Sequence, residues 1–158
     1  MRRLLLLLCL SILSLALATP GWAWPPTLEQ FTALAKEAAP PGWRLSESMA
    51  LARMADCAPQ LVAVFTKNAK YLEYRLDLDT RQADDREVAG LRRELDGRHT
   101  LFLQAGEWQR FTYLTVYFPE HMASLSLGLD DELSYDEMAV LLSAFPLDKL
   151  LAPAPEGK

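Results

Sequence analysis

Stretches in which apolar and polar side chains alternate recur along the chain and strongly limit its possible folds. In KYLEYRLDLD, residues 70–79, Leu72, Tyr74 and Leu76 alternate with charged residues, as in a strand with one solvated face. Other strand-like stretches cover residues 61–66, 99–105, 108–118 and 122–129. They show no regular alternation with helices of the kind that builds a parallel sheet. We therefore expect an antiparallel sheet.

Capping boxes, in which Ser or Thr is followed three residues later by Glu or Gln, mark the first and last helices. Thr27 and Gln30 precede LEQFTALAKEAA, whose apolar residues recur at helical spacing until a Pro-Pro-Gly sequence ends the pattern. Ser134 and Glu137 precede a second apolar stripe, which stops at Pro146. The pattern predicts one helix near each end of the folded region.

Two internal segments are less regular. Asp84 and Glu87 have capping-box spacing, and the apolar stripe behind them ends at Gly97, which predicts a short helix between strands. Residues 43–56 carry conflicting signals, because their first half alternates like a strand whereas MALARMA has the propensity of a helix. We favour a strand for the first half only.

The expected fold is therefore α+β. It consists of an antiparallel five- or six-stranded sheet, arranged as a meander, with the N- and C-terminal helices packed on one face and a short helix between strands. Asn68 and Ala69 join two strands in a tight hairpin. Residues 24–151 form a single domain, and the Pro-rich residues 152–158 form a disordered tail.

Residues 1–23 have the three-part pattern of a secretory signal peptide. Arg2 and Arg3 precede an unbroken apolar run, and small and turn-forming residues follow it. The run is shorter than the ~20 residues that span a bilayer, which favours a cleaved leader over an anchor. Cleavage after Ala18 or after Ala23 fits the pattern, and the Pro-Gly pair between them favours Ala23. We expect a periplasmic or secreted protein with no stable membrane span after leader removal.

The charge of the chain argues against nucleic acid as a partner. The formal net charge is -5, and loss of Arg2 and Arg3 with the leader leaves 14 basic against 21 acidic residues, a net charge of -7. An acidic surface repels phosphate backbones and anionic lipid head groups.

The sequence predicts no metal site and no cofactor. Cys57 is the one cysteine outside the leader, so the mature chain forms no internal disulfide, and we interpret this residue as a small buried side chain. Soft potential copper ligands are scattered through the chain without a repeated Met motif or a Cys pair. They are Met49, Met54, Cys57, His121 and Met122. His99 stands at a predicted strand start with no further ligand at a recognisable spacing.

No residue is predicted to be catalytic. The chain contains neither the G-x-S-x-G motif of a serine hydrolase nor a Gly-rich phosphate-binding loop. Ser124, His121 and Asp130 would form a triad by residue type alone. DLDTRQADD fails as a calcium loop, because Arg81 occupies a ligand position and no Gly stands at the turn. We expect a binding protein rather than an enzyme.

Residues 111–118, FTYLTVYF, are unusual because both faces of this predicted strand are apolar or aromatic. Leu114 and Val116 lie on the side that we expect beneath the helices, whereas the neighbouring strands place polar residues on the other side. Aromatic side chains on that other side would form an exposed patch or floor a cleft. The predicted binding residues are Trp108, Phe111, Tyr113 and Tyr117.

These observations predict an exported, non-enzymatic binding module. Its aromatic sheet face would hold a protein partner or a small apolar ligand of the cell envelope. The alternative is a small periplasmic metal-handling protein, with copper as the metal, or a hydrolytic protein.

Overall fold

A computed structural model of the chain describes residues 24–53, 58–79, 92–94, 100–105, 111–131 and 133–151. The predicted leader, the C-terminal tail and Cys57 lie outside these residues. The chain divides into two compact units, of which Thr27–Pro146 is the larger. The described residues of the other unit are 24–26 and 147–151, which include the short helix α5, Leu147–Leu150.

The larger unit combines helices with β-strands, so the predicted α+β class is confirmed. The helices described in this unit are α2, Leu28–Ala38, the short 3-10 helix η1, Pro119–His121, and α4, Tyr135–Ser143. The strands are β1, Arg44–Leu51; β2, Gln60–Lys67; β3, Lys70–Leu78; β4, Arg92–Glu94; β5, Thr100–Ala105; β6, Phe111–Phe118; and β7, Ala123–Asp130.

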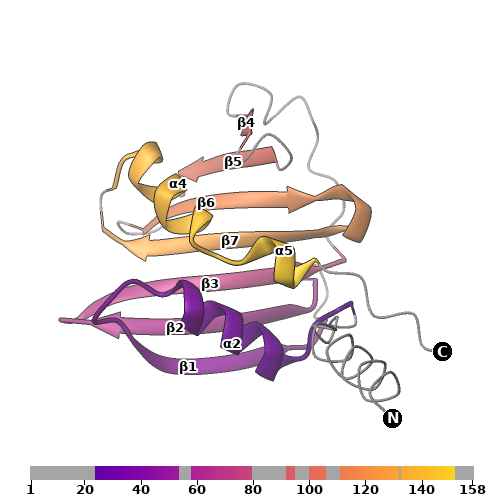
Figure 1. The fold of residues 1–158 in the computed structure, drawn as a ribbon, viewed down its shortest axis with the longest axis horizontal. Coiled ribbons are helices and arrows are strands. Elements are labelled where there is room, and N and C mark those ends of the chain that lie inside the picture. Colours follow the sequence, from indigo (N-terminus) through magenta and orange to yellow (C-terminus); the bar gives the residue numbers. More distant parts are fainter. Residues whose placement is uncertain are drawn as a thin grey trace, which may run out of the picture. The chain divides into compact units, whose positions relative to one another are not determined.

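All strand pairs are antiparallel, as predicted, and the sheet order is β1-β2-β3-β7-β6-β5-β4 (Figure 1). Two meanders, β1-β2-β3 and β4-β5-β6-β7, therefore meet side by side at β3 and β7. β4 and β5 continue the sheet beyond β6 at one edge. The chain does not form one continuous meander, because β4, which follows β3 in sequence, lies at the far edge from β3.

Two local expectations differ from the structure. β4 lies inside the segment predicted as a short helix, where Arg92 and Glu94 pair with β5 instead; residues 84–91 and 95–97 of that segment lie outside the described residues. β1 extends to Leu51 and so includes part of MALARMA. Pairing with β2 supplies backbone hydrogen bonds along β1. The free energy of this strand pairing outweighs the helix propensity of the segment.

The main core lies between the sheet and the two helices α2 and α4. Figure 1 shows both helices on the same side of the sheet, with α2 over β1 and β2 and α4 over β6. We refer to this side as the helix face. Its fully buried strand residues include Leu72, Tyr74, Leu76, Leu114, Val116, Leu125 and Leu127.

Aromatic contacts connect the helices with the centre of the sheet. The Tyr74 ring centroid lies 5.3 Å from that of Phe145, which in turn lies 6.0 Å from that of Phe31 in α2. The Tyr74 hydroxyl donates a hydrogen bond to the carbonyl oxygen of Ala38 at 3.3 Å, and burial raises the pKa of this tyrosine. These contacts place Tyr74 at the centre of the core.

The predicted local signals at the helix starts and at the first hairpin are present. Thr27 with Gln30 and Ser134 with Glu137 both form complete capping boxes. Asn68 and Ala69 have positive φ angles of 50° and 62°, as a tight two-residue hairpin turn requires. The capping boxes thus fix where α2 and α4 begin, and the turn fixes how β2 and β3 are joined.

Candidate binding face

The opposite side of the sheet carries mostly polar side chains at its centre, and we refer to it as the polar face. It is defined by alternate residues of β3, β7 and β6, which the strand pairing arranges in three rows across the sheet. The rows are Glu73–Gly128–Tyr113, Arg75–Ser126–Thr115 and Asp77–Ser124–Tyr117. Each row therefore has a charged residue on β3, a small residue on β7 and a hydroxyl-bearing residue on β6.

Along β3, Arg75 is paired with Glu73. Its Nη2 atom lies 2.5 Å from Glu73 Oε1, and the two side chains are 35% and 24% exposed. The Nε atom of Arg75 is buried and has no hydrogen-bond partner among the described residues. The guanidinium group is thus paired with the Glu73 carboxylate, while its Nε–H donor makes no hydrogen bond within the described residues.

Asp77 differs from Glu73 because it makes no ion pair among the described residues. Burial raises the pKa of its carboxyl group, and the opposing effects of Arg75 and of a hydrogen bond with Gln60 only partly offset this. In the structure Asp77 is therefore a partly desolvated carboxylate whose charge is incompletely compensated.

Tyr113 lies across the backbone of Gly128. A Cβ atom built at Gly128 would stand 2.6 Å from Cε1 and 2.9 Å from Cδ1 of the tyrosine ring, closer than any side chain tolerates. The glycine is thus required for the ring to lie this close to β7. Burial, followed by the negative charge of Glu73, raises the pKa of Tyr113, which is consistent with a hydroxyl that reaches toward β3.

The middle row is held by a hydrogen bond between the hydroxyl groups of Thr115 and Ser126, whose oxygen atoms are 2.8 Å apart. Ser124, in the adjacent row, is only 7% exposed. β7 thus presents two serines and a glycine to the polar face between longer side chains on β3 and β6. The polar face thus contains an ion pair, Glu73–Arg75, and a hydrogen bond, Thr115–Ser126, between its own side chains.

The predicted binding residues fall into two groups. Tyr113 and Tyr117 are half-buried on the polar face, whereas Leu114 and Val116 between them are buried on the helix face, as their alternation in sequence requires. The backbone of Phe111 pairs with Asp130, but its side chain lies outside the described residues, as does all of Trp108.

Glu73, Arg75 and Asp77 were not among the predicted binding residues. Their alternation with Leu72, Tyr74 and Leu76 marks a strand face that points away from the core, and a single strand gives no further information. Only the pairing of both β3 and β6 with β7 brings them near the tyrosines. The tyrosines therefore have charged residues of β3 two strands away, an arrangement that follows from the strand order and not from any local pattern.

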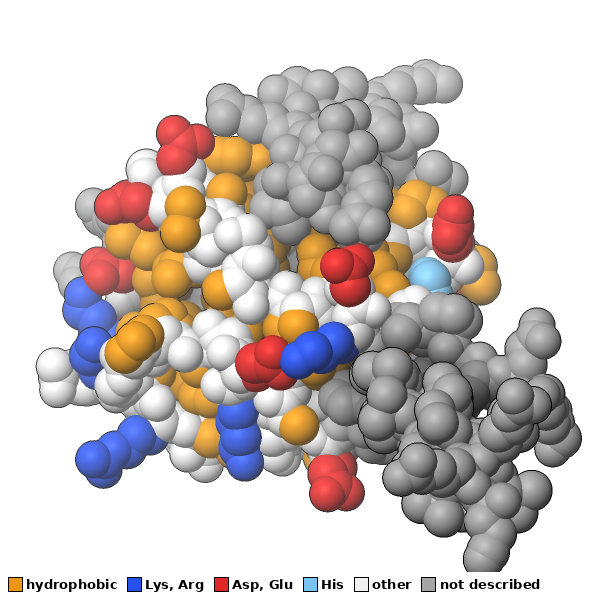
Figure 2. Space-filling view, in the orientation of Figure 1, with side chains coloured by type: hydrophobic (Ala, Val, Ile, Leu, Met, Phe, Trp, Pro, Cys, Tyr) orange, Lys and Arg blue, Asp and Glu red, His pale blue; other side chains and the backbone are white. Residues whose placement is uncertain are grey.

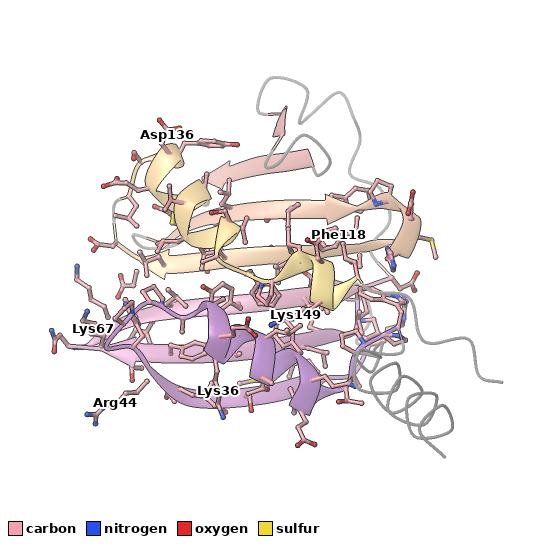
Figure 3. All side chains as sticks on the ribbon, viewed as in Figure 1. Lys36, Arg44, Lys67, Phe118, Asp136 and Lys149 are labelled. Carbon is pink, nitrogen blue, oxygen red and sulfur yellow. The ribbon has the colours of Figure 1, made fainter. Side chains whose placement is uncertain are left out.

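Charged side chains toward the edges of the larger unit show a different arrangement. Figures 2 and 3 show basic side chains, including Arg44 and Lys67, toward the β1–β2 edge, and acidic ones, including Asp136, near the start of α4. Several of these charges are paired locally. Lys70 Nζ lies 2.5 Å from Asp131 Oδ2, and Lys67 Nζ donates to the carbonyl oxygen of Pro41 at 3.2 Å.

The described residues offer little support for other kinds of site. They contain no group of three or more His, Cys, Asp and Glu side chains placed to hold a metal ion. Of the possible soft ligands, Met54 and Cys57 lie outside this part of the chain, and so does His99. No helix within the described ranges has both the length and the apolar character needed to cross a bilayer.

Comparison of the chain with protein-family models, with curated proteins and with solved structures returned no match.

Proposed function

We propose that the protein is an exported, non-enzymatic binding module that contacts a protein partner through the polar face. The observation that carries this proposal is the pair Tyr113 and Tyr117, which stand half-buried on the face opposite α2 and α4. Tyrosine is enriched at protein interfaces, because its ring supplies contact area and its hydroxyl supplies a hydrogen bond at a low cost in conformational entropy.

The polar surroundings favour a protein partner over a small apolar ligand. Glu73, Arg75 and Asp77 stand two strands away from the tyrosines, and hydroxyl groups or a glycine lie between. An apolar ligand on this face would remove water from charged groups without replacing their hydrogen bonds, which is unfavourable. A polypeptide can both cover the tyrosine rings and pair with the charged groups.

The leader pattern supports export, so the partner is expected in the periplasm or outside the cell. The test is photo-crosslinking in living cells with p-benzoylphenylalanine at Tyr117, and at Val140 as the matched control. Val140 is 69% exposed on α4, which lies on the other side of the sheet. Intact mass of the protein in the envelope fraction shows in parallel whether the leader has been removed.

A discrete crosslinked protein from position 117 but not from position 140 is the expected result. Equal crosslinking from both positions, or none from position 117, would contradict a binding role for the polar face. Stoichiometric copper or zinc in protein purified without an affinity tag would instead favour the metal-handling alternative.

A further inference from the structure

We infer that the protein self-associates through the outer edge of β1, where two copies pair as antiparallel strands around a two-fold axis at Ala50. The occupant of this edge is thus a second copy of the same chain. The inference concerns a surface other than the polar face and does not rest on the proposed function.

The two edges of the sheet differ in their protection against further strand pairing. β1 and β4 stand at the ends of the strand order, so each has one side without a strand partner among the described residues. β4 has three residues, Arg92, Arg93 and Glu94, and all of them are charged. Short length and charge are common means by which proteins prevent association of sheet edges. β1 has eight residues and is the edge long enough to pair with another strand.

Within β1, this protection is confined to the first half. The strand has a bulge between Leu45 and Glu47, and Glu47 and Arg44 are charged. Residues 48–51 pair with β2 in unbroken register and contain neither a charged residue nor a proline. Ala50 is exposed, and Leu51 is 43% exposed. The second half of β1 is therefore accessible to another strand.

The same half carries apolar side chains beside the open edge. Met49 pairs with Val62 of β2, and Val62 pairs with Arg75 of β3, so all three lie on the polar face. Val62 is only 4% exposed, whereas Leu51, on the same face and next to the edge, is largely uncovered. A second β1 would cover Met49 and Leu51 from the side that β2 leaves open.

The sequence of β1 is complementary to itself in one antiparallel register. When a sheet continues through a two-fold axis, residues that stand opposite each other lie on the same face. With the axis at Ala50, Met49 stands opposite Leu51 of the second copy. Extension of the strand by two residues then places Glu47 opposite Arg53 of the second copy. Symmetry repeats both pairs, and the small, exposed Ala50 faces itself.

The charged pairs favour this register over its neighbours. An axis at Met49 would place Glu47 opposite Leu51, and an axis at Leu51 would place Arg53 opposite Met49. Glu47 forms no ion pair among the described residues. Arg53 already pairs with Asp79, but both side chains are more than half exposed, and a guanidinium group has donors for a second carboxylate. Opposite charges directly across an antiparallel pair stabilise it.

The first test is sedimentation velocity of the purified protein over a wide range of concentrations. An edge contact is small, so we expect a weak, concentration-dependent dimer. Glu47→Lys sets like charges opposite each other twice and should raise the dimer Kd about tenfold, although it makes the net charge less negative. Arg53→Glu should have a similar effect, and the double variant should restore the dimer.

Arg44→Glu is the matched control for Arg53→Glu. It makes the same change of charge at an exposed residue of the same strand, but Arg44 lies beyond the bulge and outside the overlap. It should change the dimer Kd by less than about twofold.

The second test replaces Ala50 with cysteine in a chain whose Cys9 and Cys57 are changed to serine. Directly opposite residues of antiparallel strands have Cα atoms about 4.5–5.5 Å apart, within the range of a disulfide. Ser48 lies two residues from the axis, so its Cα atoms in the two copies would be roughly 14 Å apart. Oxidised glutathione should therefore link Ala50→Cys, but not the control Ser48→Cys, into covalent dimers.

A dimer that both charge reversals weaken, that the double variant restores and that Ala50→Cys links selectively supports the inference. A wild-type protein that stays monomeric at every concentration overturns it, and this measurement needs no variant to fold. A dimer that is insensitive to the charge reversals, or equal linkage from positions 48 and 50, also overturns the proposed pairing. The proposed function is unaffected by these outcomes, because crosslinking at Tyr117 tests it separately.

Discussion

At the scale of single residues, Gly128 shows how one position shapes the polar face. Its sequence context, ASLSLGLD, predicts only that it points away from the core with Ser124 and Ser126. The structure adds that the Tyr113 ring occupies the space where a side chain would stand. The glycine therefore determines how an aromatic residue of the neighbouring strand is oriented.

Gly128→Ala should consequently destabilise the protein by about 1–3 kcal/mol, the usual cost of overpacking. The Cβ atom would force Tyr113 off β7, because its contact with Cε1 would be 2.6 Å. Chemical denaturation measures the change. In a Tyr113→Ala background the same substitution should cost much less, and a loss that is equal in both backgrounds would show that the ring contact is not the cause.

At the scale of elements, α2 and α4 begin with signals that act within a few residues. In α4, Glu137 Oε2 accepts a hydrogen bond from the Ser134 backbone N–H at 2.9 Å, and the Ser134 hydroxyl oxygen accepts one from the Glu137 backbone N–H at 3.4 Å. These bonds satisfy two donors that a helix start otherwise leaves to water. Their short range explains why they could be predicted from sequence.

The capping box of α4 also makes a pH-dependent contribution. Hydrogen bonds from Ser134 hold the pKa of the Glu137 carboxyl below its ordinary value of 4.5. Because the folded-state pKa is lowered, this contribution is fully present above the ordinary pKa and is lost as the pH falls through the folded-state value.

Ser134→Ala should therefore cost about 1 kcal/mol of stability at neutral pH. It should also return the pKa of Glu137 toward its ordinary value, which an NMR titration of the side chain reports. Ser143→Ala is the matched control, since Ser143 lies near the end of α4, where its hydroxyl donates to the carbonyl oxygen of Val140. An unchanged Glu137 titration in Ser134→Ala would contradict the capping role.

At the scale of the whole sheet, β6 separates two chemically different surfaces. Leu114 and Val116 are fully buried on the helix face, while Tyr113 and Tyr117 remain half-buried on the polar face. Such a division lets the sheet be stabilised mainly from the helix face, and under the proposed function the polar face contacts the partner.

Leu114→Ala should leave a cavity in the helix face and cost about 2–5 kcal/mol, as large-to-small core substitutions do. Tyr117→Ser should cost clearly less, because that side chain is only half-buried. Thermal and chemical denaturation of the two variants provides the comparison. Similar losses in both would mean that Tyr117 belongs to the core and that the proposed binding surface is misassigned.

The sequence by itself determined the features that depend on neighbouring residues. The alternation in β3 and β6, the capping boxes of α2 and α4, and the Asn68–Ala69 turn were predicted because hydrogen bonds and side-chain directions within a few residues produce them. The α+β class and the antiparallel sheet followed from the order of these elements.

The tertiary structure alone decided which elements became neighbours. Strand pairing depends on the free energy of the whole sheet, and no local pattern showed that β3 would lie beside β7. The extension of β1 into a helix-prone segment has the same cause, since its backbone groups are satisfied by β2. For the candidate site, the sequence indicated Tyr113 and Tyr117 by their spacing in one strand. Their proximity to Glu73, Arg75 and Asp77 arises only because β7, with its small side chains, lies between the two strands.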